Sequence, residues 1–203
     1  MKVLIACERS GVVREAFAAR GHEAWSCDLE PSDRPGKHIQ GDVLDLLGDA
    51  WDLMIAHPPC THLAIAGARW FARKTYEQAE AIRFAETLMS VAHIPRIAIE
   101  NPLSVLSTFI RKPDQIVQPW MFGDPYTKST CLWLKGLPRL FPTQQVEQGA
   151  KKQYKGGDIP LWLSNLTKKD RARLRATTFP GMADAMAEQW GAPERLVLYP
   201  QWT

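Results

Sequence analysis

Short apolar runs alternate with amphipathic segments through the first 102 residues of the chain. Runs of four or five apolar residues bounded by polar and Gly-rich stretches are typical of strands buried in a parallel sheet. They predict strands over residues 2–6, 23–27, 38–40, 52–56 and 96–99.

Amphipathic segments between these runs predict the connecting helices. One spans residues 12–20 and is ended by Gly21, because glycine readily takes the left-handed conformation at a helix end. Another spans residues 76–92, where apolar residues recur at helical spacing. Strands that alternate with helices indicate an α/β fold with a mostly parallel sheet covered on both faces, and ligands bind such sheets at the carboxyl ends of the strands.

The pattern changes after Pro102. Residues 120–122 and 130–134 predict an antiparallel terminal hairpin, joined by the turn-rich residues 123–126. Residues 142–166 show no periodicity, and Thr167 then starts a helix with an acid three positions later. A last helix over 180–190 ends at Gly191. We expect one domain formed by residues 1–141 and 176–203, with a small insertion at 142–175.

The net charge of +3 conceals a basic segment. Residues 151–175 hold eight Lys and Arg side chains against two Asp, a net charge of +6. Such a segment suits a polyanion such as nucleic acid, although a solvated helix face explains it equally well. We interpret the insertion as a reduced target-recognition segment that relies on phosphate contacts.

The four cysteines, Cys7, Cys27, Cys60 and Cys131, form no CxxC pair and no close framework, so neither zinc nor disulfides are expected. Three of them, all except Cys60, alternate with apolar neighbours and are expected to be buried. No apolar stretch reaches the ~18 residues that a membrane span requires. These features predict a cytoplasmic protein with no metal.

Two short motifs follow predicted strands about forty residues apart. His57-Pro58-Pro59-Cys60 offers a nucleophile, and Ile99-Glu100-Asn101-Pro102 offers an acid. Asn101 is expected to order the loop. His57 either hydrogen-bonds near the thiol or is structural.

Acidic residues also follow strands. Asp28 suits ribose hydroxyls and Asp42 an adenine amino group, which together fit an adenosine-containing cofactor. The first loop, residues 6–11, is not a GxGxxG and does not favour a pyrophosphate. Glu8 in this loop suits a ligand with an ammonium group.

In these motifs the chain resembles the DNA cytosine-5 methyltransferases, especially short stand-alone members encoded by bacteriophages. Pro59-Cys60 matches the nucleophile loop of that family, Glu100-Asn101 its Glu-Asn pair, and residues 181–185 its C-terminal Gly-Asn-Ala-Val segment. The resemblance implies a Rossmann-like S-adenosylmethionine-dependent fold whose last helix closes the cofactor pocket, with S-adenosylhomocysteine as product. The cofactor-binding residues would be Cys7, Glu8, Gly11, Asp28, Leu29, Asp42, Val43, Pro58 and Ala183.

The implied reaction is methylation of carbon 5 of a cytosine in DNA. Cys60 would add to carbon 6 of an extruded or unpaired base while Glu100 protonates N3. We therefore expect a raised pKa for Glu100 and a lowered one for Cys60. Where the family has paired arginines, this chain has Lys128 and Thr130. The residues expected to contact nucleic acid are Arg69, Lys128, Thr130, Lys168, Lys169, Arg171 and Arg173.

Other functions remain open. His57-Pro58-Pro59-Cys60 resembles the Asp-Pro-Pro-Tyr loop of amino-methyltransferases, but it lacks the aromatic residue that stacks on the base, so the cytosine-5 interpretation is favoured. A non-catalytic nucleic-acid-binding module and an enzyme that modifies carbon 5 of a free pyrimidine nucleotide are the alternatives.

Overall fold

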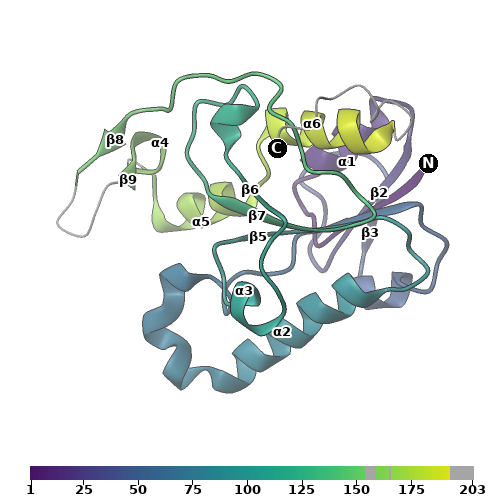
Figure 1. Cartoon of the computed structure of the whole chain (residues 1–203), viewed down its shortest axis with the longest axis horizontal. Coiled ribbons are helices and arrows are strands. Elements are labelled where there is room, and N and C mark those ends of the chain that lie inside the picture. Colours follow the sequence, from purple (N-terminus) through teal and green to yellow (C-terminus); the bar gives the residue numbers. More distant parts are fainter. Residues whose placement is uncertain (154–158, 165, 193–203) are drawn as a thin grey trace.

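The computed structural model describes residues 1–153, 159–164 and 166–192. A seven-stranded sheet with the order β3-β2-β1-β4-β5-β7-β6 forms its centre (Figure 1). The first five strands in this order are parallel, and β7 is antiparallel to both of its neighbours. The strands are β1 (Lys2–Ala6), β2 (Glu23–Asp28), β3 (His38–Gln40), β4 (Leu53–Ala56), β5 (Ile97–Pro102), β6 (Gln115–Val117) and β7 (Thr130–Lys135).

Helices cover both faces of the sheet, as the sequence predicts. Figure 1 shows α1 (Val12–Ala18) and α6 (Pro180–Gly191) on one face, and α2 (Thr75–Ser90) and α3 (Leu106–Phe109) on the other. The short 3-10 helix η1 (Val43–Leu46) adds to the second layer. The five parallel strands and the helices α1, α2 and α6 are confirmed. Their ends lie within two residues of the prediction, except that β5 continues three residues further, to Pro102.

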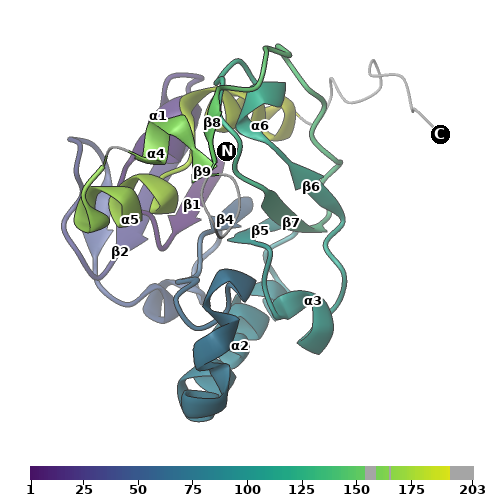
Figure 2. The ribbon, with the colours of Figure 1, turned by 90° about the vertical axis from the view of Figure 1, so that its left-hand side faces the viewer.

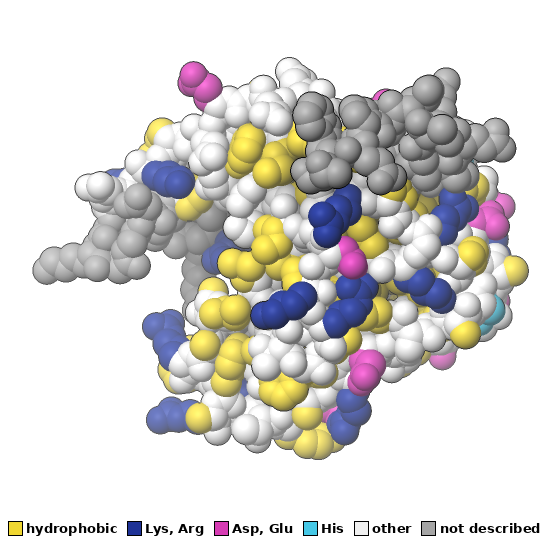
Figure 3. Space-filling model, in the orientation of Figure 1, with side chains coloured by type: hydrophobic (Ala, Val, Ile, Leu, Met, Phe, Trp, Pro, Cys, Tyr) yellow, Lys and Arg dark blue, Asp and Glu magenta, His cyan; other side chains and the backbone are white. Residues whose placement is uncertain are grey.

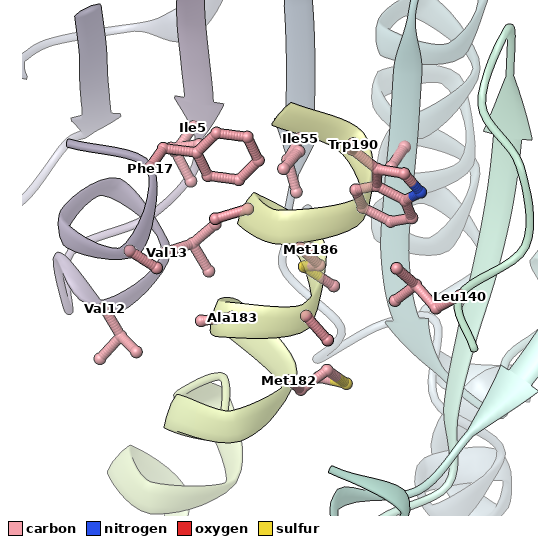
Figure 4. Close-up of a cluster of buried hydrophobic side chains, with 14 of the residues drawn as sticks. Ile5, Val12, Val13, Phe17, Ile55, Leu140, Met182, Ala183, Met186 and Trp190 are labelled. Carbon is pink, nitrogen blue, oxygen red and sulfur yellow. The ribbon is translucent and has the colours of Figure 1, made fainter. Parts of the chain in front are cut away.

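The apolar core lies against both faces. In Figure 4, Ile5 and Ile55 of the sheet meet Phe17 of α1 and Met186 and Trp190 of α6. All five side chains are buried. Because α6 packs beside α1 over the central strands, the C-terminal helix is part of the main fold.

The predicted first strand of the antiparallel hairpin is wrong. Residues 120–122 fall in and beside the 3-10 helix η3 (Pro119–Met121), and the strand that pairs with β7 is β6 (Gln115–Val117). Proline lacks the amide hydrogen that a strand ladder uses, and its fixed φ favours the first turn of a helix. Pro119 therefore ends the extended segment before Trp120.

The insertion contains small elements. These are β8 (Lys151–Lys152), β9 (Ile159–Pro160), α4 (Leu161–Ser164) and α5 (Lys168–Ala176). The predicted cap is confirmed, because the Thr167 hydroxyl accepts the amide hydrogen of Asp170 at 3.1 Å. Arg173 of α5 pairs with Asp33 in the loop that follows β2, and Figure 2 shows α5 in front of this end of the sheet.

The start of α6 is tied to the loop after η3. The Gly181 amide donates to the Asp124 carboxylate at 2.9 Å, and a Cβ on Gly181 would clash with the carbonyl oxygen of Phe122. A carboxylate at a helix N-terminus is also favoured by the helix dipole. No helix in the described ranges is both long enough and apolar enough to cross a membrane.

Candidate active site

Two neighbouring strands bring the predicted nucleophile and acid loops together. β4 and β5 are parallel and pair Ala56 with Ile99, so the next residues along each strand, His57 and Glu100, emerge side by side. The His57 Nδ1 and Glu100 Oε2 atoms are 3.0 Å apart. Both side chains are more than nine-tenths buried, which makes this a strong interaction in a site of low polarity.

Asn101 joins the same two loops. Its side-chain Nδ2 donates to the backbone oxygen of Pro58 at 2.9 Å, and the residue is buried. The Cys60 carbonyl in turn accepts the amide hydrogens of Leu63 and Ala64. The predicted ordering role of Asn101 agrees with this contact, which holds the loop before Cys60 against the end of β5.

Lys128 brings a cation to the acid. Its Nζ lies 4.0 Å from Glu100 Oε1 and donates to the Thr177 carbonyl oxygen at 3.2 Å. Only 13% of the side chain is exposed. A largely buried ammonium requires a counterion, and Glu100 supplies it.

The expected pKa directions of the two reactive groups are both wrong. Burial opposes ionisation of Glu100, but Lys128 and the hydrogen bond from His57 outweigh it and hold the pKa of Glu100 below its usual range. Burial, aided by the negative charge of Glu100, raises the pKa of Cys60 above that of a free thiol, although Lys128 and Arg175 act in the opposite direction. The ground state is therefore a carboxylate beside a protonated thiol.

Three polar atoms of this cluster are buried without a hydrogen-bond partner in the described part of the chain. They are His57 Nε2, Glu100 Oε1 and Asn101 Oδ1. An unpaired buried polar atom costs about 1–3 kcal/mol, so such atoms are uncommon unless a ligand satisfies them. Their grouping on two adjacent loops marks a place where a polar ligand fits.

A cavity of about 640 Å³ opens beside His57 at the carboxyl ends of β1, β2 and β4. The chain adds strands outwards on one side from β1 to β3 and then on the other side from β4, so the strand order reverses between the parallel neighbours β1 and β4. Open α/β sheets bind ligands at such a position. Carboxylates outnumber guanidinium groups in its wall. The lining residues are Cys7, Glu8, Arg9, Ser10, Asp28, Glu30, Asp33, His57, Asp170, Arg173, Ala176, Thr177 and Thr178.

Three of the predicted cofactor-binding residues, Cys7, Glu8 and Asp28, line this cavity. The structure places Leu29 next to Asp28 with its side chain exposed. Gly11 lies at the start of α1 with φ 72°, and Pro58 is buried in the nucleophile loop.

Other predicted cofactor contacts are placed elsewhere. Ala183 is fully buried in the apolar core, where α6 packs on α1, so its prediction as a cofactor contact is wrong. Asp42 caps η1 by accepting the Leu44 amide hydrogen at 2.9 Å, and the Val43 side chain is buried in the core. Neither lines the cavity.

Glu8 has a structural partner that the sequence does not reveal. Its carboxylate accepts the amide hydrogens of Val13 at 2.7 Å and Arg14 at 3.2 Å, which caps the N-terminus of α1. The expected role of Glu8 as partner of a ligand ammonium therefore competes with helix capping.

Arg14 is a site residue that sequence reasoning missed. Its guanidinium is buried and donates to Ser26, to Ser32 and to the carbonyl oxygens of Arg34 and Pro35. These bonds fix the loop that follows β2. An arginine on the apolar face of a predicted helix was the available signal.

The insertion closes one side of the cavity. Arg173 of α5 pairs with Asp33 at 3.1 Å, and Arg9 pairs with the same carboxylate at 3.4 Å. Arg173, predicted to contact nucleic acid, therefore lies over the cavity. Lys168, Lys169 and Arg171 are in α5, but their side chains lie outside the part of the chain that the structure describes.

Of the remaining predicted nucleic-acid contacts, one is buried and one is exposed. Thr130 is fully buried in β7 and its hydroxyl donates to the Lys128 carbonyl, so its prediction as a nucleic-acid contact is wrong. Arg69 is exposed on the 3-10 helix η2 (Ile65–Arg73), which follows Cys60, and lies 5.4 Å from the Trp70 ring centre.

Cys27 and Cys131 are buried as expected. Cys7 is half-buried instead, with φ 58° at the cavity wall. Burial and the charge of Asp28 raise its pKa to about 12. Within the described residues, no group of three or more His, Cys, Asp or Glu side chains is arranged to hold a metal ion.

Comparison with known proteins establishes the fold. No family model and no curated protein matches the chain. Among solved structures, a methyltransferase of Entamoeba histolytica is similar, with 12% identity, a TM-score of 0.50, and 78% of this chain and 62% of that one covered. An E. coli protein assigned as a prophage-encoded DNA modification methyltransferase aligns at 13% identity and a TM-score of 0.47, over 71% and 51%. The chain thus spans less than two thirds of either structure, and its fold is the Rossmann-like methyltransferase fold.

Proposed function

We propose that this chain transfers a methyl group from S-adenosylmethionine to carbon 5 of cytosine in DNA. The observation that carries the proposal is that Cys60 and Glu100 lie on adjacent loops and interact electrostatically, with Lys128 acting on both. Neither residue lines the cavity, but His57, which is hydrogen-bonded to Glu100, does. The likeness to the Entamoeba histolytica methyltransferase supports methyl transfer as the class of reaction.

The cavity suits a cationic adenosine ligand. Its wall carries the carboxylates of Glu8, Asp28, Glu30, Asp33 and Asp170, which favour a sulfonium and an ammonium group and disfavour phosphates. Asp28, at the end of β2, would accept hydrogen bonds from the ribose hydroxyls of this ligand. When bound there, S-adenosylmethionine supplies an electrophilic methyl group.

Cys60 acts as the nucleophile towards carbon 6 of the base. Its thiol must first lose a proton, and because its pKa is raised, the nearby Lys128 is needed to favour the thiolate. Bond formation at carbon 6 makes carbon 5 electron-rich. Cys60 leaves again after the proton on carbon 5 has been removed.

Glu100 binds the ring edge opposite the nucleophile. Its unpaired Oε1 accepts a hydrogen bond from the exocyclic amine of cytosine or, once protonated, donates to N3. Uracil and thymine have a carbonyl oxygen and an N3 hydrogen at these positions instead. The Glu100 carboxylate therefore favours cytosine over uracil and thymine, because only cytosine offers it an amine hydrogen.

DNA is the proposed polymer. Figure 3 shows more Lys and Arg than Asp and Glu side chains on one face of the molecule, and Arg69 and Trp70 stand exposed after the nucleophile loop. Because a stacked cytosine does not expose carbon 6 to a thiolate, the base must be extruded or already unpaired. We further propose that residues 142–175 form a reduced target-recognition insertion in a catalytic domain of residues 1–141 and 176–203.

Mass spectrometry of nucleosides tests this function. Cytosine-containing duplex and single-stranded DNA are incubated with the protein and S-adenosylmethionine and then digested. 5-Methylcytosine formed by the wild type and lost in Cys60→Ala supports the proposal. N4-methylcytosine, or methylation of free cytidine nucleotides alone, would instead support the amino-methyltransferase or free-nucleotide alternative.

A further inference from the structure

His57 connects the cofactor cavity with the acid of the site. It lines the cavity, and its Nδ1 lies 3.0 Å from Glu100 Oε2. Its Nε2 is buried and has no hydrogen-bond partner among the residues that the structure describes. Within that part of the chain, the imidazole is hydrogen-bonded to Glu100.

Because Glu100 is ionised before the reaction, it has no proton of its own to give to N3 of the cytosine. Lys128 and His57 keep its pKa low, so at neutral pH the residue is a carboxylate. Addition of a thiolate to carbon 6 of cytosine builds negative charge on N3, and that charge requires a proton. Lys128 Nζ is 4.0 Å from Glu100 Oε1, which is beyond hydrogen-bond distance, so Lys128 is poorly placed to supply one. The hydrogen-bonded neighbour is His57.

We propose that His57 is a positioning residue that supplies, through Glu100, the proton that N3 of the target cytosine takes up; this rests on the proposed cytosine-5 activity. His57 Nδ1 gives its proton to Glu100, and Glu100 gives a proton to N3. The pair thereby passes from imidazolium and carboxylate to neutral imidazole and carboxylate, with one proton lost.

Electrons balance across the ring in this step. The Cys60 sulfur forms a bond to carbon 6, the C5–C6 π pair moves between carbons 4 and 5, and the C4–N3 π pair takes the new proton. When Cys60 leaves with the electron pair of the carbon–sulfur bond, the N3 proton returns to the His57–Glu100 pair.

Several charged groups surround this pair. Lys128 faces Glu100 directly, and Cys60 interacts with Glu100 electrostatically. The groups that share the cavity wall with His57 are Cys7, Glu8 and Arg9 after β1, Asp28, Glu30 and Asp33 after β2, and Asp170 and Arg173 of α5.

The substitution that separates proton supply from packing is His57→Asn. Asparagine can donate a hydrogen bond from about the position of Nδ1, but it cannot give up a proton. His62→Asn is the matched control, because His62 lies on the same loop, is half-buried and lines a separate hollow with Tyr76 and Phe84. Rates of 5-methylcytosine formation and the KM for DNA are measured across pH 5.5–9 for both variants.

For His57→Asn we expect kcat to fall about 100-fold or more, while KM for DNA changes little. The fall in activity on the basic side of the pH profile should move to lower pH, since Glu100 must then be protonated by solvent. His62→Asn should stay within about twofold of wild type. Wild-type kcat and an unchanged pH profile in His57→Asn would overturn the proposal.

A spectroscopic measurement decides the proton position without any activity. Histidine-selective ¹⁵N NMR, with His57→Asn for assignment, reports which ring nitrogen carries the proton. We expect Nδ1 of His57 to be protonated, and Glu100→Gln to alter its signal. A neutral ring protonated on Nε2 would overturn the relay. If NMR confirms the proton on Nδ1 but the wild type transfers no methyl group, the proposed function is rejected and the His57–Glu100 proton position stands.

Discussion

The side-chain amide of Asn101 donates to the backbone oxygen of Pro58 at 2.9 Å and so joins the acid loop to the nucleophile loop. Both groups are buried, and the two residues belong to segments that are 43 positions apart in sequence. The position of Cys60 relative to Glu100 therefore depends on one hydrogen bond as well as on the β4–β5 ladder.

Asn101→Ala should weaken both stability and the site. The substitution leaves the Pro58 oxygen buried without a donor, which costs about 1–3 kcal/mol in the free energy of unfolding. Urea denaturation measures this cost, and methyl transfer should fall because the Cys60 loop is less well held. Thr61→Ala, at an exposed position of the same loop, is the control. Equal stability of the two variants would contradict the role of Asn101.

Arg14→Met should destabilise the loop that follows β2. Four acceptors lose a buried donor, so we expect the free energy of unfolding to drop by at least about 2 kcal/mol. Calorimetry should also show weaker binding of S-adenosylhomocysteine. Arg20→Met removes a partly exposed pair with Asp184 and a bond to the Ala16 carbonyl oxygen, and should cost less than about 1 kcal/mol. A cost for Arg14→Met as small as that for Arg20→Met would argue against this anchor.

Lys128→Gln and Glu100→Gln should change the reactivity of Cys60 in opposite directions. Lys128 lowers the pKa of the thiol and Glu100 raises it. Alkylation by iodoacetamide at pH 8, mapped by peptide mass spectrometry, should therefore be slower than wild type in Lys128→Gln and faster in Glu100→Gln. Equal rates in all three proteins would show that neither charge acts on the thiol.

The Arg173–Asp33 pair should matter for ligand retention more than for stability. Both side chains are partly exposed, and such pairs contribute only about 0–1 kcal/mol to folding. Because the pair closes the cavity, Arg173→Gln and Asp33→Asn should each speed the release of S-adenosylhomocysteine in stopped-flow measurements. In the double variant, the release rate should increase by less than the product of the two single increases, because both substitutions remove the same contact. If the two substitutions change the release rate independently, the contact between α5 and Asp33 does not help to close the cavity.

Much of the parallel sheet could be predicted from the sequence, because its short apolar runs end at clear turn signals. The segment after Pro102 could not be read in this way. Trp120 and Phe122 look like strand residues, but Pro119 turns the backbone into a 3-10 helix and the pairing strand is Gln115–Val117. The strand preference of the aromatic residues is overridden there, because Pro119 fixes φ and lacks the amide hydrogen that a strand needs.

The sequence predicts Cys60, Glu100 and Asp28 as site residues because each follows a strand, and their roles stay predictions. It does not predict the electrostatics of the site. The sequence did not show that Lys128 would reach Glu100 from a segment near β7, so the predicted pKa directions were wrong. Ala183 was assigned by resemblance to a cofactor segment, but the small residue serves helix packing of α6 on α1.

Trapping of the enzyme on DNA tests the nucleophile most directly. Duplex and single-stranded DNA containing 5-fluorocytosine are incubated with the protein and S-adenosylmethionine, because fluorine at carbon 5 prevents the release of the cysteine. The predicted result is a denaturation-resistant adduct whose peptide map places the bond at Cys60, and which is absent from Cys60→Ala and retained in Cys131→Ala. No adduct with either DNA, or an adduct that persists in Cys60→Ala, would contradict the account.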